Sequence, residues 1–149
     1  MKHRNAIAAI ATATALAGTC AVVVPAASAS TSAPKTHVLT FISVQEAMHN
    51  YSQTVGSQQD KDVNKAGKVV GYDLLYTVFN PKTETAKLSF TAVLSGGFVC
   101  GVANASANPV THGTVTGGTG AFKGATGTIL AKNLNKAGTR TSITITYHT

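Results

Sequence analysis

The feature that most constrains the fold is a two-residue alternation of apolar and polar side chains. Ala, Leu and Phe occupy every second position from residue 86 to residue 94, and Thr, Lys and Ser occupy the alternate positions from residue 85 to residue 91. Successive side chains of a strand point to opposite faces, so this pattern predicts a strand with one buried face. Residues 143–148 repeat it. No window beyond residue 37 shows an apolar pattern of helical period and length, so the chain is predicted to be all-β.

Turn signals such as Asn80-Pro81 and Asn108-Pro109 divide the chain into short strands. Further strands are predicted at residues 38–45, 69–79, 98–103, 110–115 and 126–134, with residues 50–57 as an additional candidate. Seven or eight such strands fit a small barrel or a sandwich. Closure removes both exposed sheet edges, so we predict an eight-stranded antiparallel barrel over residues 37–149. A lumen of that size is either filled by side chains or holds one small ligand.

The first 29 residues have the order of a secretory signal peptide. Lys2 and Arg4 precede a small-apolar run over residues 6–24, and Ala27-Ser28-Ala29 provides small residues at a cleavage site. We expect cleavage after Ala29, a flexible leader over residues 30–36, and a secreted protein. A retained membrane anchor is the alternative, although Ala and Thr make the run weakly hydrophobic. A lipid anchor on Cys20 is not expected, because Thr19 precedes it where a lipoprotein signal has a small Gly, Ala or Ser.

Charge excludes some classes of partner. Removal of residues 1–29 leaves 10 of the 12 basic side chains against the same 5 acidic ones, a formal net charge of +5. The basic residues are scattered, with one Arg and no interleaved aromatic side chains, which argues against nucleic-acid binding. A diffuse positive field favours weak, salt-sensitive adhesion to anionic cell-wall polymers or membrane surfaces. Cys100 is the one cysteine that would remain, so no intrachain disulfide is expected.

A glycine-rich segment over residues 113–127 invites a nucleotide-binding interpretation. Its spacing departs from the dinucleotide fingerprint, it lacks a Gly-Lys-Ser/Thr end, and the following residues predict a strand rather than a helix. The structural interpretation is stronger. Gly117, Gly118 and Gly120 provide positive-φ positions for a tight connection, whereas Gly124 and Gly127 allow a bulge or a close backbone approach.

Residues 115–127 also resemble the Gly-Gly-Thr-Gly-x-Phe-x-x-Ala-x-Gly signature of plant dirigent proteins and allene oxide cyclase-like barrels. Upstream, residues 60–71 resemble the Asp…Gly-x-x-Val-Gly turn and strand of bacterial members. The resemblance covers about residues 37–149. It implies an eight-stranded barrel with a partly apolar lumen, and trimers or hexamers among relatives make a homo-oligomer an expectation.

The resemblance does not transfer an activity. The plant cyclases use a first-strand Glu and a later Cys, whereas here Glu46 falls near the end of the first strand and Thr77 stands about where that Cys is expected. Both departures argue against fatty-epoxide cyclisation. Dirigent proteins use lumenal Asp and Arg. The one Arg that remains after residue 29 is Arg140, and its place in a late strand does not support that role well.

Few side chains are available for acid/base chemistry. Asp73 lies in an otherwise apolar strand, where it either points into the lumen with a pKa raised by burial or faces solvent. Asp73 and Glu46 are the candidate catalytic residues, and Asp60 is a further carboxylate. The candidate ligand-binding residues are Tyr72, Tyr76, Phe90 and Cys100, for which core packing is the structural alternative.

The sequence therefore predicts a secreted barrel that binds a small hydrophobic or aromatic molecule, and steers its cyclisation or coupling by shape and desolvation. No cofactor or metal is expected, because the histidines are widely spaced and no Cys-x-x-Cys or His-Glu-x-x-His occurs. The alternative is a non-enzymatic, wall-associated scaffold.

Overall fold

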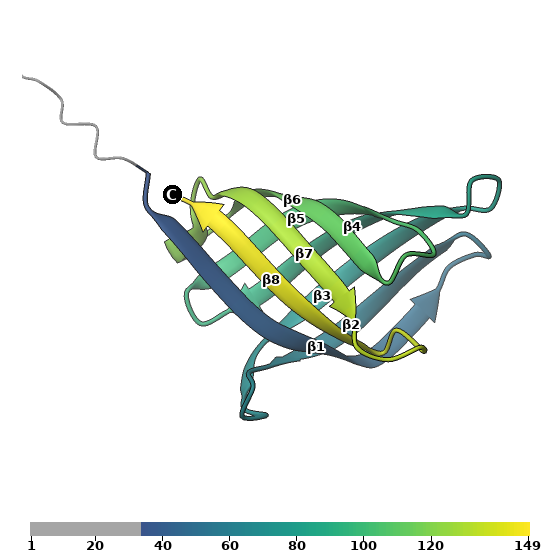
Figure 1. The fold of residues 1–149 in the computed structure, drawn as a ribbon, viewed down its shortest axis with the longest axis horizontal. Helices are drawn as coiled ribbons and strands as arrows, with labels where there is room; N and C mark the ends of the chain where they lie inside the picture. The colour runs from purple at the N-terminus through teal and green to yellow at the C-terminus, as the bar shows by residue number, and fades with distance from the viewer. Residues whose placement is uncertain (1–33) are drawn as a thin grey trace, which may run out of the picture. The chain divides into compact units, whose positions relative to one another are not determined.

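A computed structural model describes residues 34–149, and these form eight antiparallel strands closed into one barrel (Figure 1). Each strand pairs with its neighbours in the sequence, and the last strand returns to pair with the first. The predicted all-β, eight-stranded antiparallel barrel is therefore confirmed. The strands are β1 Thr36–Asn50, β2 Val55–Val63, β3 Val69–Asn80, β4 Thr85–Leu94, β5 Gly97–Ala105, β6 Val110–Gly118, β7 Thr126–Asn133 and β8 Arg140–His148.

The predicted signal peptide, its cleavage after Ala29, the alternative membrane anchor and most of the leader lie outside the described residues. Within residues 34–149, no helix is long and apolar enough to cross a membrane.

The second strand differs most from the sequence prediction. The chain forms β2 over Val55–Val63, later than the candidate at residues 50–57, and β1 continues to Asn50. The inward positions of β2 carry Gln58, Asp60 and Asp62, which are not residues that a buried strand normally presents. A polar inward face hides the period-two signal, because both faces of the strand then look polar.

The glycine segment makes the connection between β6 and β7. It contains a single 3-10 turn, η1 (Gly120–Phe122). Gly120 has a φ of 58°, and a Cβ at this position would collide with the carbonyl oxygen of Gly96, so the turn needs a glycine. Gly117 and Gly124 also have positive φ as expected, whereas Gly118 does not and instead lies against the carbonyl oxygen of Phe98. Gly127 makes the predicted close backbone approach, to the carbonyl of Thr146.

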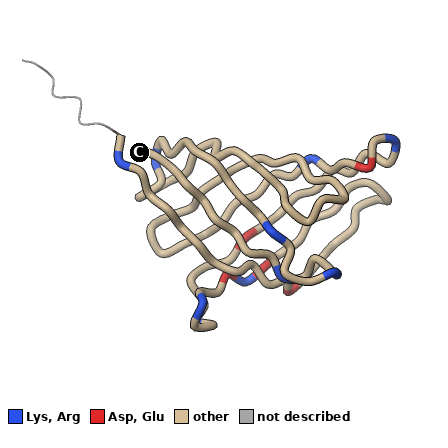
Figure 2. The backbone as a smooth tube through the Cα atoms, viewed as in Figure 1, with Lys and Arg blue, Asp and Glu red and all other residues tan. Residues whose placement is uncertain are grey.

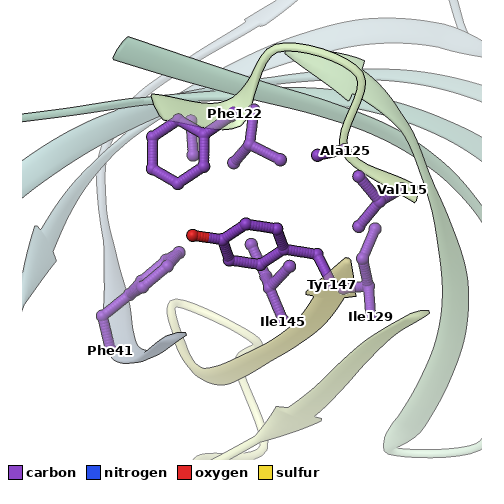
Figure 3. Packing of buried hydrophobic residues seen from close by; sticks show 9 residues of the cluster. Phe41, Val115, Phe122, Ala125, Ile129, Ile145 and Tyr147 are labelled. Atoms are coloured by element: carbon purple, nitrogen blue, oxygen red, sulfur yellow. The ribbon is translucent and has the colours of Figure 1, made fainter. Parts of the chain in front are cut away.

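Apolar side chains fill one end of the barrel (Figure 3). This is the end where β8 finishes and η1 folds over. The rings of Phe122 and Tyr147 meet edge to face with centroids 5.5 Å apart, and Ile145 lies fully buried beneath them. Aromatic pairs in this geometry add to the stabilisation that burial gives. The buried cluster, which we call the apolar plug, comprises Phe41, Ala92, Val99, Val115, Phe122, Ala125, Ile129, Ile145 and Tyr147.

Basic residues lie outside this interior. Figure 2 shows most Lys and Arg positions toward the two ends of the barrel and its turns. Lys61 on β2 contacts Glu46 on β1 in the one ion pair among residues 34–149. The positive charge of the described chain is therefore a property of its outer surface.

Candidate functional site

The lumen beyond the apolar plug contains a cavity of about 210 Å³. The turns after β5 and β7 border it at the end of the barrel opposite η1, through residues such as Ser106, Asn108 and Gly138. Phe41, Phe90 and Ile129 lie where the cavity meets the plug and its partly buried margin. The other lining side chains come from β1 to β8 and are Ser43, Gln58, Asp60, Asp73, Leu75, Leu88, Ala103, Ala105, Thr111, Ala131, Asn133, Thr141 and Ile143.

The cavity exists because small residues occupy inward positions on one side of the barrel. Ala103 and Ala105 of β5 and Ala131 of β7 present only methyl groups to the lumen. Closer to the plug, Gly101 makes room for larger neighbours, because a Cβ there would collide with the Phe90 ring and the Ile129 side chain. An eight-stranded barrel is just wide enough to fill with side chains, so a run of small ones leaves space for a ligand.

The opposite wall of the lumen is acidic. Asp60 and Asp62 lie two residues apart on β2 and share its inward face. Asp73 of β3 is the register partner of Asp60, so all three carboxyl groups lie on two neighbouring strands. These are the only aspartates in the whole sequence. We call them the aspartate cluster.

Polar side chains hold one member of this cluster in place. The Ser43 hydroxyl donates a hydrogen bond of 2.6 Å to Asp60 Oδ2, and Gln58 Nε2 donates to both carboxyl oxygens of Asp60 at 2.8 Å. Asp60 is 6% exposed. Three hydrogen bonds from two donor groups thus fix the position of this buried carboxyl group.

The other two carboxyl groups are in less favourable surroundings for a charge. Asp62 is completely buried, and no N–H or hydroxyl group of residues 34–149 donates a hydrogen bond to its side-chain oxygens. Burial raises the pKa of Asp62 to about 8, together with the negative charge of Asp73, a side-chain hydrogen bond to Asp73 and the charge of Asp60. Burial and the charge of Asp60 also raise the pKa of Asp73. Near neutral pH the cluster therefore retains a proton that ordinary aspartates would have lost.

This arrangement can exchange protons with a molecule in the cavity. Asp60 and Asp73 line the cavity directly, while Asp62 lies behind them on the same face of β2. Carboxyl groups with raised pKa values serve as general acids near neutral pH. No group of three His, Cys, Asp or Glu side chains among residues 34–149 is placed to hold a metal ion.

The residues singled out from the sequence divide between the two faces of the barrel. Asp73 and Phe90 line the cavity. Tyr72 and Tyr76 instead lie on the outer face of β3, 55% and 44% exposed, because the strand alternation that turns Asp73 inward turns its neighbours outward. They do not line the lumen.

Glu46 and Cys100 also lie away from the cavity. The register of β1 and β2 shifts between Gln45 and Ala47, so Glu46 is the extra residue of a β-bulge and pairs with Lys61 on the outside. Cys100 shares the outward positions of β5 with Val102, and its sulfur lies 3.7 Å from the hydroxyl oxygen of Thr91.

Sequence reasoning overlooked Ser43, Gln58, Asp62 and Phe41 as site residues. The available signal was the spacing of Gln58, Asp60 and Asp62, which puts three polar side chains on one face of a strand. It was hidden because this face points into the barrel rather than to solvent.

No protein-family model matches the chain, and no curated protein is similar to it in sequence. Its fold is nevertheless shared with solved structures. A pterocarpan synthase dirigent protein is 20% identical with a TM-score of 0.68, over 77% of this chain and 88% of that one. Pyocyanin demethylase is 16% identical with a TM-score of 0.63, over 74% and 99% of the two chains. An exo-specific intermolecular Diels-Alderase is 12% identical with a TM-score of 0.62, over 77% and 99%. At these identities the likeness establishes a dirigent-like barrel fold.

Proposed function

We propose that the barrel binds a small hydrophobic or aromatic molecule in its lumen. The observation that carries this proposal is the cavity of about 210 Å³ between Phe41 and Phe90 and the small side chains of β5 and β7. An apolar cavity of about 150 Å³ accepts a benzene molecule. The space therefore suits one ring with a short substituent, and the open end leaves room for a longer tail.

We further propose that the bound molecule undergoes a cyclisation or coupling step that the lumen steers without a cofactor. The walls would hold one conformer and exclude water, which contributes to rate by positioning. Asp73 would donate or accept a proton, since it lines the cavity and its pKa is raised by burial. Barrels of the same fold include a pterocarpan synthase dirigent protein and a Diels-Alderase, which supports chemistry of this kind.

The test is ligand retention by matched variants. Purified protein is incubated with small aromatic alcohols, lipid epoxides, phenoxy radicals and crude extract, and native mass spectrometry then measures retained ligand. Ala131→Phe fills the lumen, whereas Leu130→Phe adds the same ring to the outer face of the same strand. We expect the wild type and Leu130→Phe to retain a ligand and Ala131→Phe to lose it.

Retention by Ala131→Phe would contradict binding in the lumen, as would no retention by any of the proteins. In case Ala131→Phe does not fold, NMR shift changes on the wild type give a second test. They should appear at Ala103 and Ala105, which line the same cavity.

A second candidate function is adhesion to anionic cell-wall polymers. The observation that favours it is the placement of basic residues on the outer surface and turns, with one ion pair among the described residues (Figure 2). Such adhesion would require the secretion that the first 29 residues predict. Release of the mature protein from cell walls by moderate salt would support it, because screening weakens interactions between exposed charges.

Self-association is a further proposal. Tyr72, Leu74, Tyr76 and Val78 form an exposed apolar stripe along the outer face of β3. Exposed apolar patches of this kind often mark interfaces. Analytical ultracentrifugation should show a homo-oligomer that Leu74→Lys disrupts, and a monomeric wild type would contradict it.

A further inference from the structure

Among residues 34–149, the negative charge inside the barrel has no positive partner. None of the side chains that line the cavity is Lys, Arg or His. The groups that face the aspartate cluster from neighbouring strands are Ser43 and Gln45 on β1, Gly71 on β3 and Ala92 on β4, and none of them carries a charge. A chain with more than twice as many basic as acidic residues thus keeps all three aspartates inside its lumen and the basic residues of positions 34–149 away from that cavity.

Asp62 leaves the charge that faces the cavity to the other two aspartates. It is fully buried, it does not line the cavity, and as a protonated carboxyl group it hydrogen-bonds to Asp73. It is not part of an ion pair, and it shares the inward face of β2 with Asp60. A ligand that compensates the buried negative charge would therefore bind at the cavity-facing oxygens of Asp60 and Asp73.

The cavity itself is amphipathic across its width. Asp60, Asp73 and Gln58 lie on the β2–β3 side, while Ile129, Ala131 and Ile143 come from β7 and β8. A molecule that fills it therefore presents a hydrogen-bond donor or a positive charge on one side and a hydrocarbon surface on the other. A bare metal ion does not fit this description, because it would leave the apolar side empty.

We propose that the natural ligand is an amphipathic amine, a single ring or short hydrocarbon carrying a protonated nitrogen that binds at Asp60 and Asp73. This inference rests on the proposed function, since it names the chemical class of the lumenal ligand. The ammonium group would donate hydrogen bonds to carboxylates in a site of low dielectric, where charge-assisted bonds are strong. Its positive charge also stabilises the ionised aspartates, so binding would release a proton from the cluster to solvent.

The experiment compares two probes that differ in one group. 2-Phenylethylamine is protonated at neutral pH, whereas 2-phenylethanol has the same ring and chain length and is neutral. Isothermal titration calorimetry at pH 7 measures both, in two buffers of different ionisation enthalpy. We expect the amine to bind at least about tenfold more tightly, because hydrogen bonds between charged groups are worth that much, and to release a proton.

Variants test which residues cause the preference for the amine over the alcohol. Asp60→Asn and Asp73→Asn should each reduce the preference for the amine about tenfold, while affinity for the alcohol changes little. Glu84→Gln removes a carboxylate from the exposed β3–β4 turn and serves as the matched control, which should keep the full preference. If the variants do not fold, the wild type still tests the proposal, since the preference should fall as the pH is lowered from 8 to 5 and the cluster takes up protons.

Two failures are distinguishable. If the alcohol binds as tightly as the amine, the lumen binds aromatic molecules without selecting a cation, and this inference fails while the proposed function stands. If neither probe binds and no ligand is retained in the native mass spectrometry above, both fail. A preference for the amine that Asp60→Asn and Asp73→Asn leave unchanged would place the amine on the outer surface and also overturn the inference.

Discussion

The two ends of this lumen are built in opposite ways. At the end covered by η1, Phe122, Ile145 and Tyr147 belong to a buried apolar cluster, and burial of apolar surface stabilises the fold (Figure 3). Toward the other end, the same barrel keeps small side chains on β5 and β7 and aspartates on β2 and β3. The end at η1 is filled by packed apolar side chains. The other end has a cavity and buried carboxyl groups instead. The contrast indicates that the second end has a role other than stability.

The largest effect is expected in the apolar plug. Ile145→Ala should lower the free energy of unfolding by about 2–5 kcal/mol, because Ile145 is fully buried and its neighbours cannot close the space. Chemical denaturation measures this. Leu130→Ala, on the outer face of β7, is the control and should change stability far less. Equal losses in the two variants would contradict the assignment of the plug as the stabilising end.

A substitution in the aspartate cluster, Asp62→Asn, should raise the free energy of unfolding rather than lower it. Asp62 has a pKa near 8 when folded and an ordinary value of 3.8, so the folded state binds its proton more tightly than the unfolded chain. The stability that this proton provides is complete below about pH 4 and is lost as the pH rises to about 8. Asp62→Asn does not undergo this loss.

At pH 7 the variant should therefore be more stable than the wild type by roughly 2–4 kcal/mol, since one unit of pKa is worth about 1.36 kcal/mol. Urea denaturation between pH 4 and pH 8 measures both proteins. The unfolding free energy of the variant should depend less on pH. A wild-type stability that rises steadily over this range would show that Asp62 is not the buried, protonated group described above.

A smaller effect is expected from the hydrogen bonds that hold Asp60. Ser43→Ala removes one of its three hydrogen bonds and should lower the unfolding free energy by about 1.5–3 kcal/mol at pH 7, because the acceptor is a buried carboxyl group. Ser89→Ala, at an exposed position of β4, is the matched control. Equal denaturation midpoints for wild type and Ser43→Ala would show that this hydrogen bond does not stabilise the fold.

The smallest effect is expected at Glu46. Its contact with Lys61 lies on the outer surface, where water and salt screen the two charges. Glu46→Gln should leave ligand retention unchanged and shift the denaturation midpoint less than any variant above. Loss of ligand binding in Glu46→Gln would contradict the assignment of Glu46 to the outer surface and would make it a residue of the site.

The same contrast explains what the sequence could predict. Strands with an apolar inward face, such as β4 and β8, are recognised in the sequence by their alternation of apolar and polar residues. The number of predicted strands in turn predicted the barrel. The polar inward face of β2 cancels that signal, so the strand was placed too early and Asp62 was not recognised as part of the site. Local pattern and global fold conflict most where a protein carries a functional site.

Which side chains point into the lumen depends on the register in which the strands pair. Asp73 and Tyr72 are adjacent in sequence, and only the pairing with β2 and β4 shows which of them points into the lumen. The bulge at Glu46 was not visible in the sequence, because it is defined by two residues of β1 opposing one of β2. The cavity depends on how side chains from all eight strands meet, which no single segment encodes.

The lumen should hold carboxyl groups that stay protonated near neutral pH beside a ligand cavity. Because the sequence contains only three aspartates, an NMR titration of protein labelled with ¹³C at the aspartate carboxyl carbons observes this cluster alone. We expect at least one of the three signals to titrate near pH 8 and to move to lower pH when 2-phenylethylamine is added. Titration of all three signals below about pH 5 would contradict the account.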